Sequence, residues 1–334
     1  MSSAIPLAIV GLGRMGQVHA RVLASVSAVD VVAIVDPRPE AHAVASELAP
    51  DAATYRDVAE LASSGAAAAW LIAASTPNHP ELVGAAIDAG VHVLCEKPLA
   101  LDISVAEALG DRAAAAGLVL QVGFWRRFSP PWSVARSLVA AGSIGRPLML
   151  RLAQWDQDPP PPDFCDPAVS GGLAIDCGVH EFDLAEWLTG AEIVRVAGRH
   201  LPVVDAAVGA SGDVDNLVAV LDLADGAVAT VDLSRNARYG EDVRTEILGA
   251  DGAIFVDLLP SGRTRLADRS GVRVVPESQV DRADFAGVAE QARIFAARTA
   301  GAPIDGPGAA ASNRAVHVAH RVEEAIRRGV PVAV

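Results

Sequence analysis

The chain reads Gly11-Leu12-Gly13-Arg14-Met15-Gly16 immediately after an apolar run at residues 5–10. A short apolar run bounded by glycine is typical of a strand that is buried on both faces of a parallel sheet. The next apolar run ends in Val35-Asp36, so an acidic residue stands 20 positions after Gly16. A strand, a Gly-x-Gly-x-x-Gly turn, a helix and an acidic residue in this order predict a dinucleotide-binding site rather than an ordinary strand-to-helix turn.

Each glycine of the turn has a physical reason. Gly11 permits a tight turn, Gly13 lets the backbone approach a pyrophosphate, and Gly16 lets the helix pack closely against the strand. Arg14 and Met15 lie at the start of that helix, where backbone N–H groups and the positive end of the helix dipole attract phosphates. We therefore expect the backbone from residue 11 to residue 16 to bind the cofactor.

The acidic residue predicts which dinucleotide binds. Asp36 is expected to accept hydrogen bonds from the adenosine ribose hydroxyls and to repel a 2′-phosphate, which favours NAD over NADP. Arg38 is also expected to bind the cofactor, and its positive charge makes the preference for NAD over NADP less strict. NAD is the predicted cofactor, and NADP is the less favoured one.

The first 123 residues alternate between apolar runs and Ala-rich segments. Further strands are expected at residues 30–35, 68–73, 91–95 and 118–122, and helices at residues 40–48, 79–89 and 102–116. Alternating strands and helices require crossover connections, which give a parallel sheet with helices on both faces. Residues 1–123 are therefore predicted to form an NAD-binding Rossmann domain with a doubly wound sheet.

Near residue 124 the alternation stops, and residues 124–334 are predicted to form a second domain for substrate binding and oligomerisation. Asp225-Gly226 and Asp251-Gly252 each separate two apolar runs, and Asp-Gly favours tight hairpin turns. The runs are 216–223 with 227–233, and 245–248 with 253–258; helices are expected near 284–299 and 309–328, and a stiff proline loop at 159–162. This pattern indicates an α+β domain with a large, mostly antiparallel sheet.

Composition excludes several classes of protein. The 334 residues suffice for two domains, and the net charge of −14 argues against a nucleic-acid partner, which would require clustered basic residues. No apolar run reaches the roughly 18 residues of a membrane span, and no targeting pattern is recognisable, so a soluble cytoplasmic protein is expected. The three cysteines lie far apart without paired spacing, which fits neither a disulfide framework nor a zinc site, so no metal is expected.

Lys97 is the only lysine among the 27 basic residues, and it stands in Glu96-Lys97-Pro98, just past the strand expected at residues 91–95. In an open α/β sheet, that position lies in the crevice at the carboxyl ends of the strands, where ligands bind. A surface lysine is the ordinary alternative. Because arginine fills every other basic position, Lys97 indicates a site that needs a compact ammonium group.

A second candidate cluster lies between Gly171 and Gly190, which read as one helix with glycine at its end. Asp176, His180 and Asp183 follow one another at intervals of four and three, so they are expected on one face of that helix. The alternative is a solvated polar stripe. The combination of an Asp-x-x-x-His pair with a cofactor motif favours a functional cleft.

Together these motifs resemble the Gfo/Idh/MocA oxidoreductases, and within that family the chain is most similar to the inositol 2-dehydrogenases. The resemblance covers nearly the whole chain. It is carried by Gly-x-Gly-x-x-Gly, Thr76-Pro77-Asn78, Glu96-Lys97-Pro98, Gly123-Phe124-Trp125-Arg126-Arg127-Phe128, Asp176-x-x-x-His180 and Tyr239-Gly240-x-Asp242.

The resemblance implies that Lys97, Asp176 and His180 are the catalytic residues and that the Lys97-Pro98 peptide is cis. It also places further residues near the cofactor, namely Ser75, Thr76, Asn78, His79, Glu96 and Lys97. The chemistry agrees, because oxidation of a secondary alcohol removes a hydride from carbon and a proton from oxygen. His180 suits the base, Asp176 can orient it or hold a hydroxyl, and Lys97 can stabilise negative charge on the oxygen.

The predicted substrate is a small cyclic polyol or sugar. Lys97, Asp176 and His180 are expected to contact it, together with a wall formed by Arg127, Trp155, Asp156, Asp158 and Tyr239, because aromatic rings suit a sugar face and charged groups suit its hydroxyls. A domain-interface role for Arg127 and core packing for the aromatic residues are equally expected. The proline-bearing stretch 155–164 departs from the inositol dehydrogenases, so an aldopyranose is the alternative substrate.

Other functions compete with that of a dehydrogenase. A zinc alcohol dehydrogenase lacks the cysteine spacing, a short-chain dehydrogenase would need Tyr-x-x-x-Lys where Val93 stands, and a P-loop needs glycine before its lysine. A non-catalytic NAD-binding sensor and an NAD-using glycosidase remain as alternatives. The resemblance also implies a homo-oligomer, either a dimer or a tetramer.

Overall fold

The structure is a computed structural model of the chain and describes residues 4–257, 263–268, 271–274 and 286–334. It divides into two compact units. The first comprises Met1–Trp125 with Gly287–Asn313, and the second comprises Arg126–Ala286 with Arg314–Val334. This division differs from the predicted one, in which everything after residue 123 belongs to the second domain.

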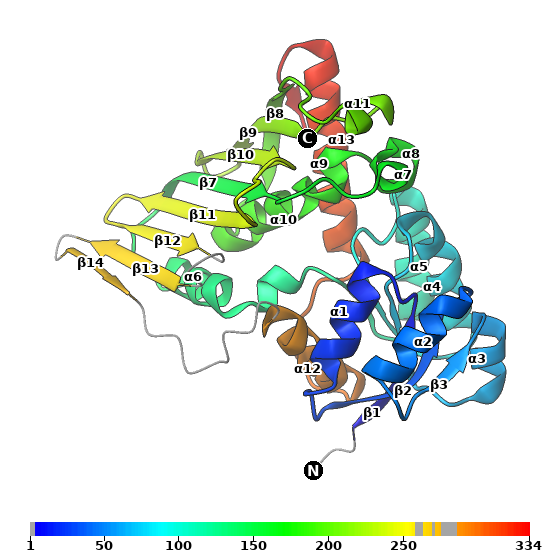
Figure 1. Ribbon diagram of the computed structural model, residues 1–334. Coiled ribbons are helices and arrows are strands. Elements are labelled where there is room, and N and C mark those ends of the chain that lie inside the picture. Colours follow the sequence, from blue (N-terminus) through cyan, green and yellow to red (C-terminus); the bar gives the residue numbers. More distant parts are fainter. Residues whose placement is uncertain (1–3, 258–262, 269–270, 275–285) are drawn as a thin grey trace. The chain divides into compact units, whose positions relative to one another are not determined.

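The first unit is built on a six-stranded sheet with the order β3-β2-β1-β4-β5-β6, in which all pairs are parallel (Figure 1). Its strands are β1 (Ile5–Val10), β2 (Val29–Val35), β3 (Ala53–Tyr55), β4 (Ala69–Ile72), β5 (His92–Cys95) and β6 (Leu120–Val122). The predicted doubly wound Rossmann sheet is therefore confirmed. The chain order reverses between β1 and β4, and ligands bind such sheets outside the carboxyl ends of the strands at this reversal.

Helices connect these strands as the alternation of the sequence predicts. They are α1 (Arg14–Leu23), α2 (Pro39–Leu48), α3 (Val58–Ser64), α4 (His79–Asp88) and α5 (Ile103–Ala115), with the short 3-10 helix η1 (Thr76–Asn78) before α4. The sequence does not predict β3 or α3, because β3 is a short, largely exposed edge strand without an apolar run.

The segment Gly287–Asn313 lies with the first unit because its apolar residues complete that unit's core. Helix α12 (Ala286–Thr299) buries Ala292 and Phe295 among core residues such as Leu7. Farther along, the Val122 amide donates to the Pro307 carbonyl at 2.7 Å. The predicted helix near 284–299 thus exists, and residues 284–285 lie outside the described residues.

The second unit contains a nine-stranded sheet with the order β14-β13-β12-β11-β7-β10-β9-β8-β15. The strands are β7 (Pro147–Trp155), β8 (Ile193–His200), β9 (Asn216–Leu223), β10 (Val228–Ser234), β11 (Asp242–Gly249), β12 (Ala253–Asp257), β13 (Arg263–Asp268), β14 (Gly271–Val274) and β15 (Val332–Ala333). Both predicted hairpins are present, as β9 with β10 and β11 with β12; residue 258 of the second lies outside the described residues. Among the described pairs, β10 with β7 is parallel and the others are antiparallel, so the predicted mostly antiparallel sheet is confirmed.

The helices of the second unit lie mainly between β6 and β9 in the chain. They are η2 (Trp125–Phe128), α6 (Pro130–Ala140), α7 (Pro162–Cys165), α8 (Pro167–Ser170), α9 (Leu173–Asp176), α10 (Gly178–Thr189), α11 (Ala206–Ala210) and α13 (Ala309–Arg328), of which η2 and α13 begin in residues of the first unit. Helix α10 packs against β7 and β10. Three of the four prolines at 159–162 precede α7 without regular structure, and the fourth begins it.

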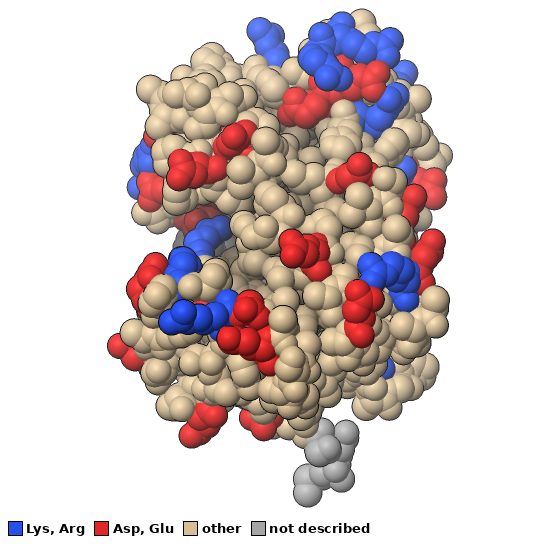
Figure 2. Space-filling view, turned by 90° about the vertical axis from the view of Figure 1, so that its right-hand side faces the viewer, with Lys and Arg blue, Asp and Glu red and all other residues tan. Residues whose placement is uncertain are grey.

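The single helix predicted from Gly171 to Gly190 is two helices in the structure. Helix α9 ends at Asp176, Cys177 follows, and α10 begins at Gly178 and ends before Gly190, which has φ of +76°. None of the described helices combines the length and the apolar character that a membrane crossing requires. On the face seen in Figure 2, acidic and basic side chains of the described residues occur in small groups among neutral ones.

Candidate active site

The glycine turn has the close contacts that the motif requires. Gly11 has φ of +93°, and a Cβ there would lie 2.7 Å from the Ala74 nitrogen; a Cβ on Gly16 would lie 2.0 Å from the Gly11 oxygen. A Cβ on Gly13 would meet no atom within 4 Å. Gly11 and Gly16 are thus required by the protein's own packing, whereas the space at Gly13 lets a ligand approach the backbone.

The start of α1 fits an anionic group. No side chain caps this helix end, and Arg14, Met15 and Gly16 form its first turn, so their backbone N–H groups have no acceptor in the preceding turn of the helix. Backbone N–H groups at a helix start bind phosphates. The open approach at Gly13 and the uncapped start of α1 therefore fit the pyrophosphate of a dinucleotide.

Asp36 lies at the end of β2 beside this turn. Its Oδ2 accepts from the Leu12 amide at 2.9 Å and from Arg38 Nη2 at 2.9 Å, while Oδ1 accepts from Arg38 Nε at 2.9 Å. Burial raises the pKa of this carboxyl, but the Arg38 and Leu12 hydrogen bonds outweigh it, so the pKa is lowered. Asp36 is therefore a fixed carboxylate next to the phosphate turn, and it neutralises Arg38.

The segment before α4 contains the predicted nicotinamide-end residues. Thr76 is buried in η1, and Asn78 Nδ2 donates to Ser75 Oγ at 3.0 Å. The His79 ring is buried, with Nδ1 2.8 Å from the Pro98 carbonyl and Nε2 3.1 Å from the Ala74 carbonyl. Burial lowers the pKa of His79. The His79 ring thus links the Lys97-Pro98 segment to Ala74, which lies against Gly11.

The Lys97-Pro98 peptide is cis, as the resemblance implies. Beneath it, Glu96 is buried, and its Oε1 lies 2.7 Å from His19 Nε2, while the Lys97 amide donates to Glu96 Oε2 at 3.3 Å. Burial alone raises the pKa of Glu96, but the hydrogen bond and charge of His19 lower it overall. Glu96 therefore holds the backbone at Lys97 through an ion pair with His19.

In the second unit, Asp176 ends α9 and His180 is the third residue of α10. His180 is buried, with 6% of its surface exposed, and its amide donates to the Cys177 carbonyl at 3.2 Å. Asp183, three residues on in α10, forms a bidentate ion pair with Arg127. The break at Cys177 separates Asp176 from the helix that carries His180.

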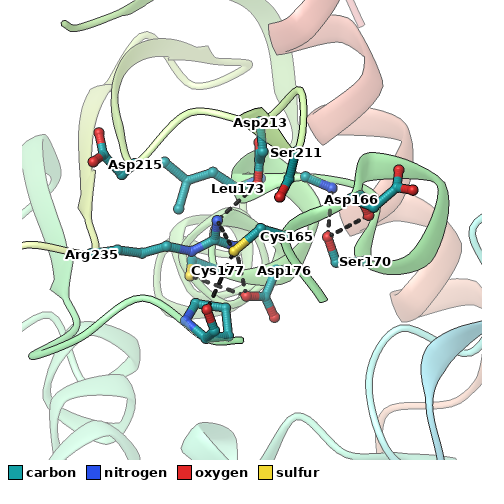
Figure 3. A network of polar contacts seen from close by, with 12 residues as sticks. Cys165, Asp166, Ser170, Leu173, Asp176, Cys177, Ser211, Asp213, Asp215 and Arg235 are labelled. Atoms are coloured by element: carbon teal, nitrogen blue, oxygen red, sulfur yellow. Dashed lines mark hydrogen bonds and ion pairs between the residues drawn. The ribbon is translucent and has the colours of Figure 1, made fainter. Parts of the chain in front are cut away.

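Asp176 belongs to a buried polar network (Figure 3). Arg235 Nη2 donates to Asp176 Oδ2 at 3.0 Å, and Nη1 donates to Asp213 Oδ2 at 2.8 Å. Burial lowers the pKa of Arg235, but the neighbouring Cys177, Asp176 and Asp213 raise it overall. Cys177 Sγ lies 3.4 Å from Asp156 Oδ2 and 3.8 Å from Asp176 Oδ2, so the structure brings Asp156 close to Asp176.

The remaining predicted substrate residues lie in different surroundings. Trp155 stacks with the guanidinium of Arg244, 4.7 Å from the ring centre. Asp158 forms an exposed ion pair with Arg238, and Tyr239 is 72% exposed and donates to Asp242.

Arg127 is committed to Asp183, which is buried with a pKa raised by burial despite this pairing. The structure thus gathers Asp156, Asp176 and Cys177 in one network and gives Arg127 an ion pair of its own.

Sequence reasoning misses the buried ion pairs that support these residues. Glu181, next to His180, pairs with Arg126, and burial raises its pKa. His19 and Arg235 are likewise missed, since they belong to no recognised motif. One available signal is Glu181 itself, an acidic residue directly after His180 in α10. Among the described residues, no group of His, Cys, Asp and Glu has the arrangement of a metal site.

Comparisons with known proteins agree with this geometry. Residues 5–124 match the model of an oxidoreductase family with an NAD-binding Rossmann fold, and residues 132–255 match the GFO/IDH/MocA C-terminal domain. The chain is 36% identical to a myo-inositol 2-dehydrogenase of Thermotoga maritima over 80% of this chain and 79% of that protein. It is 32% identical to a scyllo-inositol 2-dehydrogenase (NAD(+)) of Bacillus subtilis over 84% and 82%.

A solved structure is similar over almost the whole length. The scyllo-inositol dehydrogenase of Lactobacillus casei with bound NAD(H) and scyllo-inositol has a TM-score of 0.85 and 27% identity, covering 99% of each chain.

Proposed function

The chain belongs to the Gfo/Idh/MocA family of oxidoreductases, and we propose that it oxidises a secondary alcohol of a cyclic polyol or sugar, with NAD as the hydride acceptor. The observation that carries this function is the similarity of the chain to inositol 2-dehydrogenases over about four fifths of both lengths. The glycine turn and Asp36 supply the matching cofactor site, and an inositol is the first substrate to test.

His180 is the base in this proposal. A buried imidazole can accept the hydroxyl proton as the alcohol becomes a carbonyl. Lys97 stabilises negative charge on the substrate oxygen with its ammonium group, and Asp176 holds a neighbouring hydroxyl or orients the imidazole. These roles follow from the chemistry of the side chains and from the resemblance.

The cofactor residues of this chain suit NAD. NAD, when bound, accepts the hydride from the carbinol carbon. The backbone at Gly13 and the first turn of α1 hold the pyrophosphate, and Asp36 accepts from the ribose hydroxyls. Arg38 is already paired with Asp36, so it is not available to a 2′-phosphate.

An aldopyranose is the second candidate substrate. Residues 155–164 carry four prolines, extend into α7 and include Asp156, which contacts the Asp176 network. A loop of this composition is stiff, so it changes the shape of a polyol site rather than adapting to it. The alternative without catalytic activity is a protein that binds NAD as a sensor.

One screen tests these functions together. The purified protein is incubated with NAD and, separately, with myo-inositol, scyllo-inositol, glucose and xylose at mildly alkaline pH, and NADH is followed by absorbance. We expect NADH formation with at least one inositol. Turnover with the aldopyranoses alone would identify the protein as a sugar dehydrogenase. Tight NADH binding without any turnover would favour the sensor.

We also propose that the protein is a cytoplasmic homo-oligomer. On the outer face of the nine-stranded sheet, Met149, Val220 and Leu248 are large apolar residues with more than a third of their surface exposed, as a subunit interface would require. The three cysteines are buried thiols, which suits a reducing compartment. Light scattering of the pure protein measures the subunit number, and cell fractionation tests the location.

A further inference from the structure

Arg235 is a fully buried cation that no described motif explains. It directly follows β10, and its side chain is 0% exposed. Its partners are Asp213, with 6% of its side chain exposed, and Asp176, with 16%. A buried guanidinium is costly unless carboxylates compensate it, so these two partners are a requirement of the fold at this position.

The contacts of Arg235 close a ring around one turn of helix (Figure 3). Asp213 Oδ1 accepts from the Leu173 amide at 3.1 Å, at the start of α9, and its Oδ2 accepts from Arg235. Arg235 in turn binds Asp176, the last residue of α9. Both ends of α9 are thus tied to the same guanidinium.

The local backbone is shaped for this ring. Gly172, just before α9, has φ of +77°, and a Cβ there would lie 3.0 Å from Asp213 Oδ1. A side chain would therefore press on the carboxylate that holds the Leu173 amide. Because the ring is closed, the position of the Asp176 carboxylate follows from Arg235.

We propose that Arg235 is a positioning residue, which fixes the Asp176 carboxylate in orientation and keeps it ionised during alcohol oxidation. This inference rests on the proposed function of Asp176. Arginine suits the task because its planar fork reaches two carboxylates at once and it stays charged at every physiological pH. Lysine could supply the charge but not both directed hydrogen bonds.

The charged and titratable groups around Asp176 come from five segments. They are Arg235 after β10, Asp213 before β9, Cys177 and His180 on the chain following α9, Asp156 after β7 and Cys165 in α7. Arg235 is the cation whose guanidinium contacts the Asp176 carboxylate directly. Without it, Asp176 and Asp213 would be two neighbouring carboxylates that favour protonation.

The test is a pH profile of kcat and of kcat/KM for the wild type and Arg235→Met, with NAD and myo-inositol as substrates, or with whichever polyol gives turnover in the screen. We expect kcat at pH 7 to fall by about 10- to 100-fold and the acidic limb to move up by about one pH unit or more. In Arg235→Lys, the acidic limb of the pH profile should return to its wild-type position, while kcat stays several-fold below that of the wild type.

A matched control is Arg314→Met. Arg314 pairs with Glu186 of α10 at 2.8 Å, so this variant also removes an arginine-carboxylate pair from the helix that carries His180. It should lower the melting temperature but leave the acidic limb in place. NADH binding, followed by fluorescence, should be unchanged in all variants.

The outcomes separate the two proposals. If the wild type oxidises the polyol and Arg235→Met keeps the wild-type acidic limb, with a loss of kcat no larger than that of Arg314→Met, Arg235 is only structural and the inference is overturned. If the wild type oxidises no polyol, the proposed function fails first, and the positioning role falls with it. If Arg235→Met does not fold, Arg235→Gln retains a neutral donor and gives the same comparison.

Discussion

Each unit has a buried ion pair next to a residue with a predicted catalytic role, but the two pairs act differently. In the first unit, Glu96 pairs with His19 and accepts from the backbone amide of Lys97. In the second unit, the carboxylate of Asp176 is itself bonded to Arg235. The first unit therefore places its residue through the backbone, whereas the second controls the charge of a side chain directly.

This difference predicts two kinds of mutational effect. Substitutions of His19 or Glu96, which support the Lys97 backbone, should change stability and cofactor binding, because they shift that backbone. Substitutions of Arg235, which binds the Asp176 carboxylate, should change turnover and its pH dependence.

The largest loss is expected when the reactive groups themselves are removed. Lys97→Met removes the ammonium group and His180→Ala removes the base, and each should lower kcat by about 10²- to 10⁴-fold. The dissociation constant of NADH, from fluorescence titration, should remain within a few-fold of the wild type. Near-normal turnover in either variant would exclude that residue from the mechanism.

Two glycines separate packing from ligand approach in the first unit. Gly16→Ala places a Cβ 2.0 Å from a backbone oxygen, so it should destabilise the unit by more than about 3 kcal/mol in chemical denaturation. Gly13→Ala meets open space and should barely change stability, yet it should weaken NADH binding about tenfold or more, because the Cβ occupies the approach of the pyrophosphate. Equal NADH affinity in Gly13→Ala and wild type would contradict the cofactor site.

Breaking the pair beneath Lys97 tests the backbone role of Glu96. His19→Leu leaves a buried carboxylate without its partner and should cost about 3–5 kcal/mol of unfolding free energy, while kcat of the folded protein changes less than tenfold. The pKa of Glu96 is lowered in the folded state, so its contribution is present above its unfolded pKa of about 4.3 and is lost as the pH falls through the folded value.

Denaturation at several pH values measures this contribution. The wild type should lose stability in acid, and His19→Leu should lose less of it. A kcat loss in His19→Leu as large as that of Arg235→Met would remove the contrast between the two units.

A further prediction concerns cofactor choice. Asp36→Ser releases Arg38, whose guanidinium can then bind a 2′-phosphate, so the ratio of kcat/KM with NADP to that with NAD should rise about 10- to 100-fold. The double variant Asp36→Ser with Arg38→Ala should lose this gain. An unchanged ratio in the single variant would show that Asp36 does not set the preference.

Local patterns in the sequence predict the sheets well. The glycine turn, the alternating apolar runs and the Asp-Gly hairpins each depend on neighbouring residues, so they can be recognised without a structure. The break at Cys177 cannot, because it accompanies contacts of α9 with Asp213 and Arg235, which lie 40 and 59 residues away from their partners.

The residues that support the site cannot be predicted from the sequence for the same reason. His19 and Glu96 are 77 positions apart, and nothing in either neighbourhood announces the pair. The placement of Gly287–Asn313 with the first unit likewise depends on Phe295 filling a distant core. Sequence motifs identify the residues that carry chemistry, whereas the residues that hold them become visible only through long-range contacts.

The most direct test of the proposed chemistry is a crystal structure of the protein with NADH and the polyol that supports turnover. We expect Lys97 Nζ and an imidazole nitrogen of His180 to lie within about 3 Å of the same substrate hydroxyl, on the carbon that faces the nicotinamide. A bound polyol that contacts neither side chain, or contacts them through different hydroxyls far from the nicotinamide, would contradict the mechanism.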